Sequence, residues 1–385
     1  MTEQLSLATQ VRRWLTDAGA PLTHDRVTAA ARAICGDTAG NDLVVHHLTR
    51  TLRTELIGST ALNALLDDVA VTDVLINGAQ STWVDRGGGL QRVVLPQQSE
   101  VQLQCMAQRL AVACGQRLDA AKPWVDARLP DGTRLHVVIP PIAVSGVCVS
   151  LRTFRPRVFS LADLVDQGAL PSRAAGLLRA LLVAKRAFLV TGGTTSGKTT
   201  FLASLLSELP TCERVVVVED SQELRCHHPH VVSLQSRGHN TDGAGMVSLR
   251  DLVRQALRMR PDRIVVGECR GAEVVELLCA LNTGHSGCAG TMHANSPADV
   301  PARLEALGSL GGLDRHAVHS QLAASLPCIL HMGRRGRLRV LEEIALLGMD
   351  SARTVRATTA WARDGRPTPG IQALEDFVAV KTEPQ

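Results

Sequence analysis

The sequence predicts an α/β protein of two domains, in which an N-terminal α+β domain precedes a C-terminal domain with a mostly parallel sheet. Three observations predict this class. A chain of 385 residues is too long for one compact core. Strands alternate with helices from about residue 171 onward, which is the pattern of an open α/β sheet. Within that part, Val215–Val218 is a run of valines, as expected for a strand buried on both faces.

The N-terminal part is expected to contain a helical extension over residues 1–60 and an α+β domain over residues 61–155. Apolar residues recur at helical spacing in the extension, whereas the following segment has short apolar runs separated by Asn-Gly and Gly-Gly turns. The pattern predicts strands near 74–76, 82–84 and 93–95, a helix over 100–115, a hairpin over 128–134 and a strand ending near 151.

A linker is expected over residues 156–170, because Arg155-Pro156-Arg157 interrupts both patterns. The remaining residues, 171–385, form the second predicted domain. Its expected strands are 187–191, 215–218, 264–266 and one at Thr291, and its expected helices are 199–209, 248–259 and 273–281. Residues from 336 onward give ambiguous strands and loops.

Composition excludes several classes of protein. Hydrophobic residues make up 45% and charged residues 20%, which is typical of a globular chain and not of a disordered one. No apolar run approaches the roughly 18 residues that a membrane span needs, and no signal peptide is evident, so we expect a cytoplasmic protein. The net charge of +4 is only weak evidence for nucleic acid as the partner, and the aromatic content of 2% leaves few stacking platforms for single strands. Ten cysteines without a C-x-x-C pair argue against zinc.

One segment fits the phosphate-loop pattern of Gly, four residues, then Gly-Lys-Thr. Glycines let successive backbone N–H groups point at phosphate oxygens, and the following helix adds its positive end. The lysine reaches the β- and γ-phosphates, and the threonine hydroxyl binds Mg²⁺. A strand before the loop and a helix after it are the context that this mechanism requires. The loop consists of Gly192, Gly193, Thr194, Thr195, Ser196, Gly197, Lys198 and Thr199.

Acidic residues follow two of the other predicted strands, Glu219 after one and Glu268 after the other. The carboxyl ends of parallel strands meet at one edge of a sheet, where such acids can hold Mg²⁺ through water or orient an attacking water. Each acid alone is equally compatible with an ordinary solvated turn. His285 and His293 flank a glycine-rich stretch, and a histidine in such a loop is most simply a hydrogen-bonded structural residue.

Several runs together resemble one family, the bacterial type II/type IV secretion ATPases, also called traffic ATPases. The run RMRPDRIVVGECRGAEVVELLCALNTGHSGCAGTMHANSP (258–297) resembles the family's Walker B and His boxes, and VVVVEDSQEL (215–224) resembles its Asp box. VTDVLING (71–78), VDARLPDGTRLHVVIPP (125–141) and SLRTF (150–154) are similar to its N-terminal domain. The resemblance covers roughly residues 60–345 and is strongest to the tight-adherence (Flp) pilus-assembly ATPases.

The resemblance implies a role for each matching residue. Lys198 and Thr199 would bind phosphate and Mg²⁺ within the loop 192–200, which also includes Thr200. Glu219 and Glu223 would lie near the metal and the water, Glu268 would polarise that water, and His293 would couple the γ-phosphate to conformation, with His285 as a second candidate. Arg128, Arg134 and Arg152 match N-terminal-domain arginines that would close over the phosphates as arginine fingers do.

The family also implies a RecA-like C-terminal domain, ATP bound between the two domains, and a homo-hexameric ring. Such a ring, associated peripherally with the inner face of the cytoplasmic membrane, would drive an inner-membrane platform protein for pilus assembly or protein secretion. The chain departs from the family at Thr195, where the family's loop has glycine, so the loop's shape or its nucleotide affinity is expected to differ.

Other functions stay open from the sequence. A nucleic-acid-translocating ATPase, as in conjugation-like DNA transfer, is favoured by the overall basic charge and by the basic run 334–339, which is also compatible with a solvated hairpin turn. A regulator that binds nucleotide without turnover is favoured only by Thr195. A GTPase is disfavoured because the chain has no N-K-x-D run.

Overall fold

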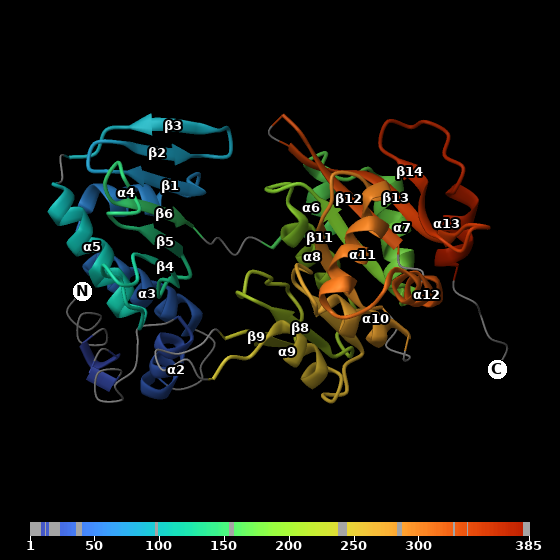
Figure 1. Cartoon of the computed structure of the whole chain (residues 1–385), viewed down its shortest axis with the longest axis horizontal. Helices are drawn as coiled ribbons and strands as arrows, with labels where there is room; N and C mark the ends of the chain where they lie inside the picture. Colours follow the sequence, from blue (N-terminus) through green and yellow to red (C-terminus); the bar gives the residue numbers. More distant parts are fainter. Residues whose placement is uncertain are drawn as a thin grey trace. The chain divides into compact units, whose positions relative to one another are not determined.

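The computed structural model describes residues 9–11, 13–14, 24–35, 41–96, 99–153, 158–237, 245–282, 287–325, 328–336 and 338–379. The chain divides into two compact units, Met1–Arg155 and Pro156–Gln385 (Figure 1).

The first unit is built on an antiparallel sheet. Within the described residues the sheet has six strands in the order β3-β2-β1-β6-β5-β4. Alternation of buried and exposed side chains sets its faces, so that Val74 and Ile76 point into the core. The strands are β1 (Asp73–Asn77), β2 (Thr82–Asp85), β3 (Leu90–Val93), β4 (Trp124–Arg128), β5 (Arg134–Val138) and β6 (Cys148–Arg152).

Helices complete this unit. The helix α5 begins at a capping box in which Ser99 and Gln102 bond each other's backbone, and it buries Leu103, Met106 and Leu110 against the sheet (Figure 1). Ile57, at the end of α3, belongs to the same core, so α3 is packed on the sheet domain. The helices are α2 (His24–Cys35), α3 (Asn41–Ile57), α4 (Thr60–Asp67) and α5 (Glu100–Ala113).

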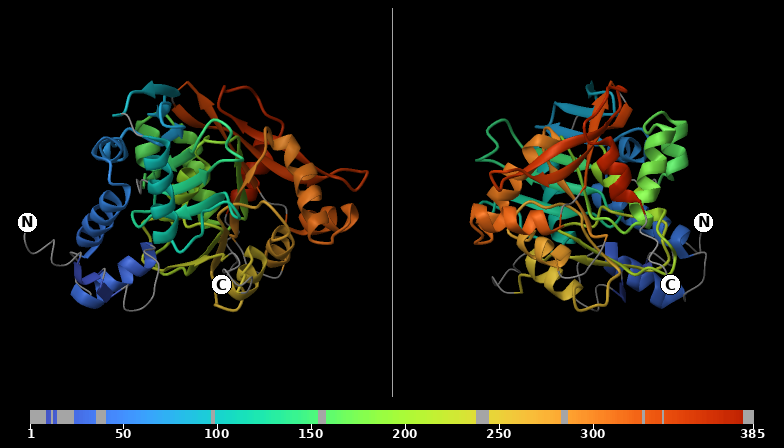
Figure 2. Two further views of the ribbon diagram at one scale, coloured as in Figure 1. Left: turned by 60° about the vertical axis from the view of Figure 1, so that its left-hand side comes forward. Right: turned by 90° about the vertical axis from the view of Figure 1, so that its right-hand side faces the viewer.

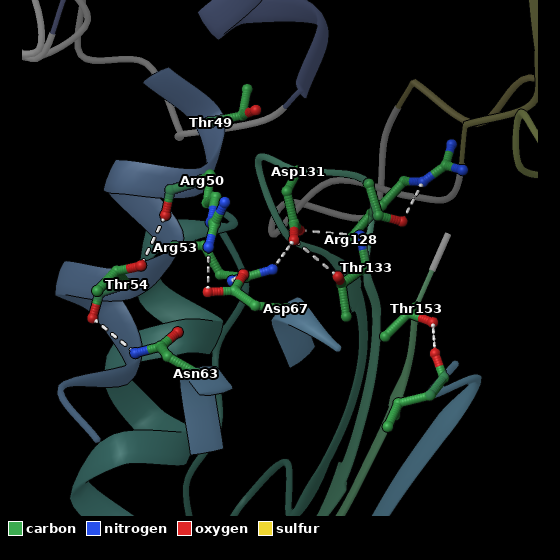
Figure 3. A network of polar contacts seen from close by, with 12 residues as sticks. Thr49, Arg50, Arg53, Thr54, Asn63, Asp67, Arg128, Asp131, Thr133 and Thr153 are labelled. Carbon is green, nitrogen blue, oxygen red and sulfur yellow. Dashed lines mark hydrogen bonds and ion pairs between the residues drawn. The ribbon is translucent and has the colours of Figure 1, made fainter. Parts of the chain in front are cut away.

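A buried arginine ties α3 to the sheet (Figure 3). The side chain of Arg53 is 5% exposed, and it pairs with Asp67 at 2.5 Å and with Asp131 in the β4–β5 turn at 2.7 Å. Burial tends to raise the pKa of Asp67, but hydrogen bonds from Arg50 and Arg53 outweigh that effect and leave the pKa below its usual range. The part of the predicted extension that forms α3 therefore shares both a core and an ion network with the sheet.

The second unit contains a mostly parallel sheet, which confirms the predicted fold class. Its described strands number eight, in the order β14-β13-β12-β7-β11-β10-β8-β9, and all neighbours from β12 to β9 are parallel. The strand β13 extends the sheet antiparallel to β12, and β14 in turn pairs antiparallel with β13. The bounds are β7 (Phe188–Gly192), β8 (Val215–Glu219), β9 (Val231–Gln235), β10 (Arg263–Val266), β11 (Ala289–His293), β12 (Cys328–Arg335), β13 (Leu338–Met349) and β14 (Val355–Ala362).

Helices cover both faces of this sheet, as Figure 2 (right) shows with green helices on one side and orange ones on the other. Alternate valines of β8 serve opposite faces: Val215 and Val217 pack with α6, α7, α8 and α13, and Val216 and Val218 pack with α9 to α12. The helices are α6 (Leu161–Asp166), α7 (Ser172–Val183), α8 (Lys198–Ser207), α9 (Leu249–Ala256), α10 (Val274–Asn282), α11 (Val300–Leu310), α12 (Arg315–Ser325) and α13 (Ile371–Val378), with a 3-10 turn η1 (Pro297–Asp299).

The segment 156–170, expected to be a linker, includes structure that belongs to the second unit. The helix α6 starts at a capping box formed by Ser160 and Asp163, and its Leu161 and Leu164 are buried in the core beside α7. Sequence reasoning missed α6 because a helix of six residues is too short to show helical periodicity.

Candidate functional site

The phosphate loop connects the middle of the parallel sheet to α8. The strand β7 lies between β11 and β12, and α8 begins at Lys198. Gly192 has a φ of +146°, and a Cβ placed there would lie 2.4 Å from the carbonyl oxygen of Met332 and 2.6 Å from Ser196 Oγ. Gly197, with a φ of +88°, precedes α8 without a side-chain cap. Gly197 therefore caps none of the first backbone N–H groups of the helix, and these groups can donate hydrogen bonds to an anion.

The side chain of Lys198 folds back onto the loop and bonds its backbone. Its side chain is buried, and Nζ donates to the carbonyl oxygens of Gly192 at 3.1 Å and Gly193 at 2.8 Å. Burial lowers the pKa of Lys198, and the Glu268 carboxylate opposes that shift. Ser196 is also buried and donates from Oγ to the Gly193 carbonyl at 2.9 Å. In the same loop Thr199 is half-buried, and Thr194, Thr195 and Thr200 are exposed.

A histidine links Lys198 to the acid of the neighbouring strand. His293 ends β11, with Nδ1 3.3 Å from Lys198 Nζ and Nε2 2.8 Å from Glu268 Oε1. Burial and the Lys198 cation lower the pKa of His293, and Glu268 opposes them. A neutral ring lets Nδ1 accept a hydrogen bond from the Lys198 ammonium, and we assign the tautomer on that basis. The approach of Nε2 to Glu268 Oε1 is a close polar contact and not an aligned hydrogen bond, because this buried oxygen has no hydrogen-bond partner among the described residues.

Glu268 has a second partner, Arg270, whose guanidinium forms an ion pair with it. The hydrogen bond to Glu268 raises the pKa of Arg270, and the charges of Asp220 and Glu223 contribute further. The acids that follow β8 and β10 thus lie at one edge of the sheet, as parallel strands require. Sequence reasoning missed Arg270, although its place two residues after Glu268 was a usable signal.

Glu219 holds the turn after β8. It is 4% exposed, and its Oε1 accepts the backbone N–H groups of Glu223 and Leu224, each at 3.0 Å. Gly267 lies against it, since a Cβ there would be 2.5 Å from Glu219 Cγ. The side chain therefore braces the turn that carries Glu223, and it packs against the backbone directly before Glu268.

The three arginines predicted from the resemblance lie in the first unit, in one row across its sheet. Strand register places Arg134 directly opposite Arg128 on one side and Arg152 on the other. Arg128 Nε donates to the Gly132 carbonyl at 3.1 Å, and Arg152 Nε lies 3.3 Å from Asp73 Oδ1. Directly opposed like charges destabilise a sheet, and Asp73, the strand partner of Arg152 on β1, offsets part of this positive charge.

The remaining candidates are placed as follows. His285 lies outside the described residues. The basic run 334–339 includes the end of β12 and the start of β13, where Arg335 pairs with Glu342 at 2.7 Å and Arg339 Nε donates to the Thr195 carbonyl at 3.3 Å. In the described ranges no helix has both the length and the apolar character to span a bilayer. Among the same residues no group of three or more His, Cys, Asp or Glu side chains is arranged to hold a metal.

A phosphate loop on the central parallel strand, with a lysine, a histidine and an acid in contact beside it, defines a P-loop nucleoside triphosphatase with a RecA-like core. A family model described as "Type II/IV secretion system protein" matches residues 55–357. The chain belongs to this family. The family resemblance read from the sequence is thereby confirmed, and the closer placement with the tight-adherence ATPases stays a prediction.

Known proteins of this kind match most of the chain. "Putative conjugal transfer protein Rv3659c" of Mycobacterium tuberculosis is 52% identical over 336 residues, covering 86% of this chain and 95% of that protein. "Type IV secretion system protein PtlH" of Bordetella pertussis is 30% identical, covering 80% and 95%. The solved ATPase DotB of Legionella pneumophila is 20% identical with a TM-score of 0.54, covering 86% and 87%, and it supports the fold alone.

Proposed function

We propose that this protein is an ATP-hydrolysing motor that powers pilus assembly or protein secretion. One observation carries the proposal: Lys198, His293 and Glu268 form a continuous set of contacts, from the phosphate loop across β11 to the end of β10. Family membership supplies the secretion context.

The reaction is ATP plus water to ADP plus phosphate. The backbone N–H groups of 192–200 and Lys198 bind the phosphates. Glu268 accepts a proton from the attacking water, for which it must exchange its contacts with His293 and Arg270 for the water. His293 touches both the lysine and the acid, so it is placed to report the γ-phosphate to the rest of the sheet.

The loop fits a nucleotide cofactor with Mg²⁺. Hard oxygen ligands suit Mg²⁺, which keeps several waters and uses few protein ligands. The Thr199 hydroxyl would hold it directly and Glu219 through water, because Glu219 Oε1 is already engaged by two N–H groups. When bound, Mg²⁺ neutralises charge on the phosphate oxygens.

Arg128, Arg134 and Arg152 are proposed to stabilise the transferred phosphoryl group. Their shared register concentrates positive charge at one place on the first unit's sheet, which supports an anionic partner. Family membership is the basis for a homo-hexameric ring at the inner face of the cytoplasmic membrane, acting on an inner-membrane platform protein.

Replacement of Lys198 tests nucleotide binding. The Lys198→Ala variant is expected to lose at least about tenfold in ATP affinity, because a charge-assisted contact to the phosphates disappears. Isothermal titration with ATP and Mg²⁺ measures it. Lys122→Ala is the matched control, since Lys122 is an exposed lysine of the first unit that bonds Gln116. Equal ATP affinity in wild type and Lys198→Ala would contradict the proposal.

A nucleic-acid-translocating ATPase is the second candidate, and one observation favours it: the Mycobacterium tuberculosis relative is named a putative conjugal transfer protein. The basic run offers it little support, because Arg335 is paired with Glu342. Stimulation of ATP turnover by DNA, with a steep loss as salt increases, would favour this candidate over protein secretion.

A further inference from the structure

Arg339, a member of the basic run 334–339, lies against the phosphate loop. It is the second residue of β13 and reaches the loop across β12, the strand that pairs with β7. Its Nε donates to the Thr195 carbonyl at 3.3 Å. Its stem covers Gly197, where an added Cβ would lie 3.3 Å from Arg339 Cβ and 3.4 Å from Cγ.

The residue that it contacts needs support. Thr195 has a φ of +60°, in the left-handed region that β-branched side chains disfavour. Glycine adopts this conformation freely, so a threonine there shifts the free loop toward other shapes. Because the backbone N–H groups bind phosphate only when they point inward together, any such shift weakens nucleotide binding.

We propose that Arg339 is a positioning residue for nucleotide binding, which holds Thr195 in its left-handed conformation and so preserves the phosphate-binding shape of the loop. The inference rests on the proposed ATP site and deepens it. Two contacts act together: the guanidinium fixes the Thr195 carbonyl by a charge-assisted hydrogen bond, and the stem packs over Gly197 at the start of α8. Arg339 needs no contact with the nucleotide for this role.

A double-mutant cycle on ATP affinity tests the inference. In the full chain, Arg339→Ala is expected to weaken ATP binding about tenfold, measured by isothermal titration. Thr195→Gly alone is expected to bind at least as tightly as wild type. In the double variant the loss relative to Thr195→Gly is expected to shrink to about threefold or less, because glycine keeps the loop shape without the arginine.

Two further variants sharpen the result. Arg339→Met retains the apolar stem and removes the hydrogen bond, so it replaces Arg339→Ala in the cycle should that variant not fold. Arg335→Ala is the matched control from the same hairpin, because Arg335 pairs with Glu342, and its ATP affinity is expected to equal that of wild type.

The outcomes separate this inference from the function on which it rests. An equal loss on removing Arg339 from wild type and from the Thr195→Gly variant would overturn it and indicate that the Arg339 charge acts on the phosphates directly. No loss in either background would overturn it as well. Failure of the wild-type chain to bind ATP would instead overturn the proposed function.

Discussion

The charge state of His293 decides how the lysine and the acid communicate. Nδ1 lies 3.3 Å from the Lys198 ammonium, so only a ring that is unprotonated at Nδ1 can accept a hydrogen bond from the lysine. Burial and the neighbouring cation lower the pKa of His293, which keeps the ring neutral at physiological pH. Protonation would place two donors between Lys198 and Glu268 and repel the lysine.

Turnover is therefore expected to fall as pH decreases through the lowered pKa of His293, and to be steady above it. Replacing the ring by His293→Gln should reduce kcat about tenfold or more while ATP affinity changes little, and it should flatten the acid side of the pH profile. Initial-rate measurements of ATP hydrolysis between about pH 5 and 8 give the profile. An unchanged acid limb in the variant would assign the titration to another group.

At the scale of elements, the ion network of Arg53 fixes α3 and the β4–β5 turn to one another. Arg53 is held by Asp67 from the end of α4 and by Asp131 from the turn between the strands that carry Arg128 and Arg134. When a buried arginine loses one carboxylate partner, its charge stays out of water, but part of the electrostatic attraction that offset this desolvation cost is lost. The network thus supports both the helix and the arginine row.

Asp67→Asn is expected to destabilise the first unit by about 2 kcal/mol. Hydrogen exchange of amides in α3 and α4 should accelerate about tenfold or more. Because the folded-state pKa of Asp67 is depressed, its contribution is present at neutral pH and is lost as pH falls through that pKa. Asp68→Asn is the control, since its Arg86 partner is more exposed and the change should cost under about 1 kcal/mol. Equal exchange in both variants would show that Arg53 does not depend on Asp67.

Some elements could be predicted from sequence because their signal is local. The valines of β8 and the apolar run of β10 identify strands buried on both faces, and the loop motif fixes β7 and α8 around it. The strand expected at 93–95 begins earlier, at Leu90, because the backbone pairs with β2 and leaves Val94 95% exposed. Long strands such as β12 escaped prediction, since His331 and Gly333 interrupt an apolar pattern that pairing with β7 and β13 completes.

The candidate site also contains residues that a local sequence motif identifies and residues that no local motif identifies. Lys198, the acids and His293 lie in recognisable sequence motifs. The contact of Arg339 with Thr195 joins residues 144 positions apart, so no local sequence pattern indicates it. Arg53 and Asp131 are 78 positions apart, and their ion pair could not be predicted from the sequence either. Such pairs are defined by folding alone.

At the scale of the whole molecule, the phosphate loop and the arginine row belong to different units of one chain. The residues proposed for phosphate binding and hydrolysis, Lys198, His293 and Glu268, all belong to the second unit. The proposal therefore assigns ATP binding and ATP hydrolysis to different residues of the second unit. The phosphate loop binds ATP, and Glu268 accepts the proton of the water that hydrolyses it.

The most direct measurement compares ATP affinity with single-turnover hydrolysis in wild type and Glu268→Gln, with Glu375→Gln as an exposed-acid control. The account predicts that Glu268→Gln binds ATP within about threefold of wild type and hydrolyses it at least about a hundredfold more slowly, since the amide cannot accept the water's proton. Glu375→Gln should match wild type in both. Hydrolysis at the wild-type rate by Glu268→Gln would contradict the central claim.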